Sequence, residues 1–63
     1  MAKDEQEIWI SSIQDTISKI NSHFGLAQVS FIFRNHNAKA IEDLDPSDLP
    51  DVFSEIHELA NNL

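Results

Sequence analysis

The spacing of apolar residues near the C-terminal end of the chain constrains the fold most strongly. From position 49 onward an apolar residue returns every three or four positions, which is the period of an α-helix with one buried face. Asp45, Ser47 and Asp48 are preferred capping residues, and Pro50 fits only the first turn of a helix. The sequence therefore predicts an amphipathic helix over residues 48–62. Its apolar stripe consists of Leu49, Val52, Phe53, Ile56, Leu59, Ala60 and Leu63.

The same segment carries the net charge of the whole chain. Residues 42–63 contain seven acidic residues and no Lys or Arg, whereas residues 1–41 contain four acids and four bases, so the formal charge of −7 belongs to one segment. An acidic helix face commonly serves only to keep a small domain soluble. It can also dock a basic protein, or imitate the phosphates of a nucleic acid. The carboxylates on this face are Asp48, Asp51, Glu55 and Glu58.

A first helix is predicted over residues 4–24. Its apolar residues follow the alternating three-and-four spacing of a helix that packs against another helix. Gly25, the only glycine, fits the left-handed position that ends many helices, and Leu26 would then fold back on the last turn. The expected seam consists of Ile10, Ile13, Ile17, Ile20 and Phe24.

Residues 26–37 fit two structures. The run from Val29 to Phe33 is β-branched and aromatic, so it could form a strand that pairs with a second strand. That alternative is an α+β fold, helix–β-hairpin–helix, with strands near 28–33 and 38–41. Helical spacing is also present, Asn37 suits a left-handed helix end, and an isolated two-stranded hairpin is marginally stable.

We therefore favour a helix over residues 27–36, which makes the chain an all-α, three-helix small domain spanning residues 1–63. Between the second and third helices, Ile41 and Leu44 are three residues apart. This spacing predicts that a short 3₁₀ turn places both side chains in the core.

The composition excludes several kinds of site. Without cysteine the chain has no disulfide, and three histidines alone are too few for a structural zinc site. The stretch from Asp43 to Ser47 opens like a calcium loop, but it lacks the glycine and the bidentate glutamate that such a loop requires. The sequence shows no nucleophilic side chain that a histidine (His23, His36 or His57) could activate as a general base. We expect no metal, no cofactor and no catalytic residues, hence no enzyme activity.

The N-terminal sequence and the charge of the chain indicate where the protein is located and which partners it can bind. The polar, acidic N-terminus does not resemble a signal peptide, and no apolar run reaches the ~20 residues of a membrane span. The expected location is cytoplasmic, without membrane contact.

Four Lys and Arg residues are too few for direct nucleic-acid binding, which commonly uses about six to ten phosphate contacts. The expected partner is another protein, neutral or basic.

The apolar residues exceed what so small a core can bury. Ile8, Trp9, Phe31 and one of Ile32 or Phe33 are candidates for an interface, because exposed aromatic groups anchor protein contacts. Stability is also marginal for this length: ordering the chain costs roughly 95 kcal/mol, and burial returns roughly 90 kcal/mol. A homodimer is therefore expected.

Residues 35–59, NHNAKAIEDLDPSDLPDVFSEIHEL, resemble a C-terminal helical module of small phage and conjugative-element proteins. In that module a helix ends in a stop similar to K-Y-G-A, and S-I-E-D-L-x-P-x-x-Y leads into a final amphipathic helix. Asn37-Ala38 replaces the Gly-Ala stop, and Ala40 to Leu44 with Pro46 match the connector. The resemblance implies a helix before Asn37 and a mobile-element origin; it implies no chemistry for particular residues.

These observations favour a small acidic accessory or regulatory protein that acts by protein–protein binding. Two alternatives stay open. One is an acidic nucleic-acid mimic that inhibits a nucleic-acid-binding enzyme, and the other is a structural oligomerisation module.

Overall fold

The computed structural model describes residues 2–20 and 22–62, and within these residues it contains helices and no strand. The all-α, three-helix prediction is confirmed. The strands of the alternative fold are absent from the described residues, because 28–33 lies within a helix and 38–41 leads into a 3₁₀ turn. The elements are α1 (Lys3–Ser18), α2 (His23–Asn35), η1 (Ile41–Asp43), η2 (Pro46–Asp48) and α3 (Leu49–Asn61).

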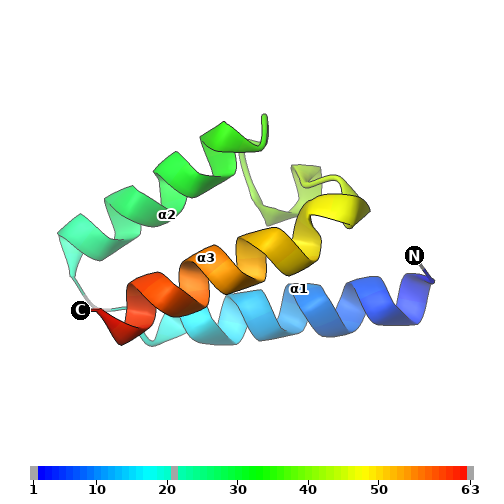
Figure 1. The fold of residues 1–63 in the computed structure, drawn as a ribbon, viewed down its shortest axis with the longest axis horizontal. Coiled ribbons are helices and arrows are strands. Elements are labelled where there is room, and N and C mark those ends of the chain that lie inside the picture. The colour runs from blue at the N-terminus through cyan, green and yellow to red at the C-terminus, as the bar shows by residue number, and fades with distance from the viewer. Residues whose placement is uncertain (1, 21, 63) are drawn as a thin grey trace.

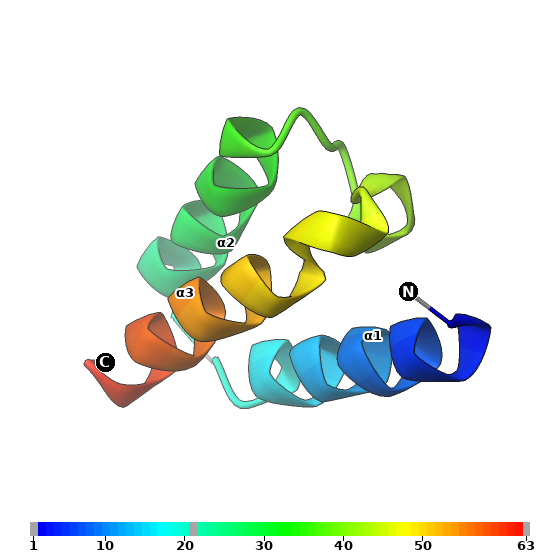
Figure 2. The ribbon, with the colours of Figure 1, turned by 45° about the vertical axis from the view of Figure 1, so that its right-hand side comes forward.

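The third helix organises the molecule. α3 packs against both α1 and α2, which lie on either side of it (Figures 1 and 2). The connection from α2 to α3, which contains η1 and η2, lies above the N-terminal half of α1 (Figure 1). The amphipathic stripe predicted for this helix is the reason for its central place, because it can cover two neighbours at once.

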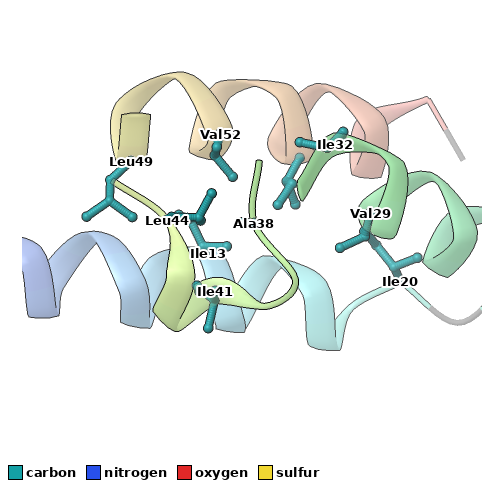
Figure 3. Packing of buried hydrophobic residues seen from close by; sticks show 10 residues of the cluster. Ile13, Ile20, Val29, Ile32, Ala38, Ile41, Leu44, Leu49 and Val52 are labelled. Carbon is teal, nitrogen blue, oxygen red and sulfur yellow. The ribbon is translucent and has the colours of Figure 1, made fainter. Parts of the chain in front are cut away.

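The core lies where the three helices and the connecting segment converge. Ile13 of α1 and Val52 and Ile56 of α3 are fully buried. Figure 3 shows side chains from α1, α2, the connection and α3 pointing toward one another. Ile41 and Leu44 are buried at either end of the η1 turn, as predicted. The buried apolar residues are Ile13, Ile20, Val29, Ile32, Ala38, Ile41, Leu44, Leu49, Val52 and Ile56.

α3 begins one residue later than the predicted residue 48 and is preceded by the 3₁₀ turn η2. Asp45 caps that turn: its Oδ1 accepts hydrogen bonds from the Ser47 backbone N–H at 3.0 Å and from Ser47 Oγ at 2.8 Å. These bonds lower the pKa of the Asp45 carboxyl, because they favour its charged form. Pro50 lies in the first turn of α3, as expected. Leu63, placed on the apolar stripe above, lies outside the described residues.

The end of α2 is closed by a left-handed residue, as the sequence indicates. Asn37 has φ 59°. Its N–H donates to the Arg34 carbonyl at 2.9 Å, and the Ala38 N–H donates to the Phe33 carbonyl at 2.9 Å. This pair of bonds is the Schellman motif, in which the residue after the left-handed one packs against the helix. Ala38 is accordingly buried.

The boundary between the first two helices was predicted incorrectly. α1 ends at Ser18 instead of continuing to 24, and α2 begins at His23 instead of 27. Ser22 is the cap that opens α2: its Oγ accepts the N–H of Gly25 at 2.8 Å. Gly25 therefore lies in the first turn of α2 and is buried, and it does not have the positive φ of a helix end. The serine cap prevails here because it satisfies an otherwise unpaired N–H group.

The shifted boundary changes which residues of the predicted seam are buried. Ile13 and Ile20 are in the core and Ile10 and Ile17 pack against it, but Phe24 is largely exposed. Because α2 is a separate helix with its own orientation, residues after the break do not continue the apolar stripe of α1. Leu26, expected to fold back on α1, is a partly exposed residue of α2.

Candidate functional site

The predicted acidic face of α3 divides into two pairs. Asp48 and Glu55 lie on the side toward α2, where both contact His36 at the end of that helix. His36 Nε2 is 2.8 Å from Glu55 Oε2, and His36 Nδ1 is 3.7 Å from Asp48 Oδ2. Asp51 and Glu58 are exposed. The four carboxylates are therefore not equivalent.

The surroundings of His36 favour its charged form. The hydrogen bond to Glu55 raises the pKa of His36 above 6.5; partial burial opposes this rise, and the negative charges of Glu55 and Asp48 add to it. His36 follows the last turn of α2, and Asp48 precedes the first turn of α3. A positive charge at a helix C-terminus and a negative charge at an N-terminus both complement the helix dipoles.

The sequence predicted an acidic face with no compensating base, and the structure corrects this. A histidine from another helix provides the compensation. The signal available in the sequence was the position of His36 immediately before the left-handed Asn37, where a cation suits a helix end. Its partners are 12 and 19 positions away, at Asp48 and Glu55, so no local pattern could identify them.

Trp9, predicted as an interface residue, packs against α3. Its ring is half-buried and meets Phe53 of α3 edge-on, with ring centroids 5.4 Å apart and an angle of 65° between the planes. Phe53 in turn stacks on His57 at 5.6 Å. Trp9 therefore joins α1 to α3. Of the two inward candidates on α2, Ile32 is buried and Phe33 packs against the core.

Ile8 does lie on the surface. It is 65% exposed on the side of α1 that faces away from the core. Around it is a shallow depression that is largely open to solvent, lined by residues one and two turns apart on the same helix. The lining consists of Asp4, Glu7, Ile8, Ser11 and Ser12, and we call this surface the α1 hollow. It combines an apolar centre with two carboxylates and two hydroxyl groups.

A second exposed apolar surface lies on α2. Phe31 is 57% exposed, as the sequence suggested, and Phe24 is 67% exposed, which it did not. The two rings are seven residues apart and therefore on the same side of the helix, two turns from each other. Ala27 is exposed between them, and Gln28 is half-buried. We call the set Phe24, Ala27, Gln28, Phe31 and Asn35 the aromatic face of α2.

Neither a metal site nor a membrane-spanning helix is present among residues 2–20 and 22–62. These residues contain no cluster of three or more His, Asp or Glu side chains placed to hold a metal ion. Asp43 and Asp45, which open the calcium-like stretch, accept hydrogen bonds from the Lys39 N–H at 3.3 Å and from Ser47. None of the helices in the described part of the chain is both long enough and apolar enough to cross a membrane.

Comparison with protein-family models, with curated proteins and with solved structures gave no significant match.

Proposed function

We propose that this chain is a small acidic accessory or regulatory protein that acts by binding another protein through the α1 hollow. The observation that carries the proposal is the exposure of Ile8 beside the carboxylates of Asp4 and Glu7. An apolar centre with a polar rim is the usual composition of a protein interface. The partner is a neutral or basic protein that presents an apolar side chain next to Lys or Arg.

Each part of the hollow has a separate role in this proposal. Covering Ile8 removes apolar surface from water, and full burial of such a side chain contributes about 1.5–3 kcal/mol. The carboxylates of Asp4 and Glu7 attract a basic partner and orient it, which affects the association rate more than the final affinity. Ser11 and Ser12 supply hydroxyl groups at the rim.

The nucleic-acid mimic has less support. A mimic needs a row of free carboxylates, but Asp48 and Glu55 are engaged by His36. The remaining pair, Asp51 and Glu58, is seven residues apart, which is about 10 Å along a helix. Two charges at that distance are far sparser than the phosphates of a duplex. A mobile-element origin, to which the resemblance of residues 35–59 points, is consistent with a small accessory protein.

The proposal is tested by capturing the partner from host lysate with matched variants. The wild type and Leu26→Ser, which changes an exposed apolar residue on α2, should capture the same protein. Ile8→Ser should reduce capture at least about tenfold, which corresponds to ~1.4 kcal/mol. Glu7→Lys should also weaken capture, to a smaller extent, and reduce the dependence of capture on salt.

Capture that is insensitive to both Ile8→Ser and Glu7→Lys would contradict the proposed surface. Loss of the partner on Asp51→Lys and Glu58→Lys, with no effect of Ile8→Ser, would instead favour the acidic mimic. Circular dichroism of each variant confirms that the helices are retained.

A further inference from the structure

The aromatic face of α2 is a surface that protein binding through the α1 hollow does not use. Gly25, Val29 and Ile32 are the buried residues of α2. Phe24 and Phe31 are not among them, and each exposes more than half of its surface. Two exposed phenylalanine rings on one side of a thirteen-residue helix form an apolar patch of the kind that marks a binding surface.

The distribution of charge indicates what can approach this face. Residues 16–41, which contain all of α2, include Lys19, Arg34 and Lys39 and not a single acid, so their formal charge is +3. The other residues hold all 11 acids and one base, Lys3, a formal charge of −10; together the two parts give the net −7. α2 itself contains no acid, and the two carboxylates that lie toward it, Asp48 and Glu55, are paired with His36, so two copies of this chain can meet on α2 without bringing unpaired carboxylates together.

We propose that the aromatic face of α2 pairs with the same face of a second copy, with the two α2 helices antiparallel. Phe24 and Phe31 are equally distant from the midpoint between Ala27 and Gln28. A two-fold axis through that midpoint places Phe24 of each copy opposite Phe31 of the other, about 5 Å along the helix from the axis. The spacing is thus self-complementary.

The residues at the axis suit a close helix pair. Ala27 is small, and it allows two helices to approach within the ~8–10 Å typical of packed helices. Gln28 carries an amide that both donates and accepts, so it can bond to its own copy across a two-fold axis. The five residues of the face are uncharged, so the contact buries no unpaired charged group. Phe24 and Phe31 then form an aromatic pair at each end of the contact.

The small size of the contact limits its strength. α2 has 13 residues and is therefore about 20 Å long. A contact confined to one helix of this length buries less than the roughly 1,200–2,000 Å² of a stable complex. The dimer is accordingly weak, with a dissociation constant between about 10 µM and 1 mM. Because α1 and α2 lie on either side of α3 (Figure 2), the α1 hollow stays open in this dimer.

Sedimentation equilibrium of the full chain between about 20 µM and 2 mM tests the pairing. The weight-average mass should rise toward twice the monomer mass, and added salt should strengthen association, because screening reduces the repulsion between two chains of charge −7. Phe31→Asp should increase the dissociation constant at least about tenfold, and Leu26→Ser should leave it within about twofold. A monomeric mass at 2 mM overturns the proposal, as does association that is insensitive to Phe31→Asp.

Cysteine cross-linking tests the antiparallel arrangement, since the chain has no native cysteine. Ala27→Cys lies next to the axis and should form a disulfide-linked dimer rapidly on mild oxidation. Asn35→Cys lies about 11 Å from the axis along the helix, so its two copies should be far apart. Faster cross-linking of Asn35→Cys than of Ala27→Cys overturns the antiparallel pairing. If association requires an added acidic protein instead of a second copy, the α2 face has a different partner and the proposal is also overturned.

Discussion

His36 Nε2 lies 2.8 Å from Glu55 Oε2, and this contact joins the C-terminal end of α2 to the middle of α3. The two residues are 19 positions apart in the chain. His36 is the C-cap of α2 and immediately precedes the left-handed Asn37, whose N–H donates to the Arg34 carbonyl, so the histidine is held by the closed helix end as well as by Glu55.

The ion pair makes stability depend on pH. The hydrogen bond to Glu55 raises the pKa of His36 in the folded state, so protonated His36 favours folding. The contribution is fully present below the unfolded value near pH 6.5 and is lost as the pH rises through the higher folded pKa. Because both groups are partly exposed, we expect a loss of about 0.5 kcal/mol between pH 6 and pH 9. Urea unfolding followed by Trp9 fluorescence measures it.

The matched control for this pH dependence is His36→Gln, which should flatten the decrease in unfolding free energy above pH 6. His23→Gln changes an exposed histidine at the start of α2 and should leave the decrease unchanged. An identical pH profile in wild type and His36→Gln would show that the ion pair contributes nothing to folding.

Asn37 provides a test of the helix end. With φ 59°, this residue occupies a conformation that costs an ordinary L-residue about 1–2 kcal/mol and glycine nothing. Asn37→Ala should lower the free energy of unfolding by about 1 kcal/mol, and Asn37→Gly should equal or exceed the wild type. Equal stability of the Ala and Gly variants, measured by urea unfolding, would contradict the left-handed assignment.

Ser22 provides a test of the corrected boundary between α1 and α2. Its Oγ accepts the Gly25 N–H, so Ser22→Ala should cost about 1 kcal/mol. Ser30→Ala, in the exposed middle of α2, should be neutral or slightly stabilising, because alanine has the higher helix propensity. Thermal unfolding monitored by circular dichroism distinguishes them. A cost for Ser30→Ala that matches Ser22→Ala would argue against the cap.

The two sides of α1 should respond differently to the same change. Ile13 is fully buried, so Ile13→Val should destabilise the fold by about 0.5–1.5 kcal/mol. Ile8→Val, in the α1 hollow, should change stability by less than about 0.5 kcal/mol. Chemical denaturation of both variants gives the comparison. A larger effect at Ile8 than at Ile13 would mean that the helix is rotated relative to this structure.

Several elements could be predicted because their determinants are local. The stripe on α3, the proline in its first turn and the left-handed Asn37 all follow from residues within a few positions of one another. The boundary between α1 and α2 is also local, but two local signals competed there. Gly25 can end a helix and Ser22 can begin one. The apolar spacing that continues up to Phe24 favoured Gly25 as the end of the first helix, whereas Ser22 in fact caps the start of α2.

By itself, the sequence determines the amphipathic helices near the two ends of the chain and the segregation of charge, because helix periodicity and capping act over a few residues. It leaves residues 26–37 open between helix and strand. Only the tertiary structure decides which polar and apolar groups remain free. His36 meets Glu55, Trp9 meets Phe53, and Phe24 stays exposed, because these outcomes depend on how helix faces meet in space. The acidic outer face of α3 is therefore reduced to Asp51 and Glu58, and the candidate interfaces move to α1 and α2.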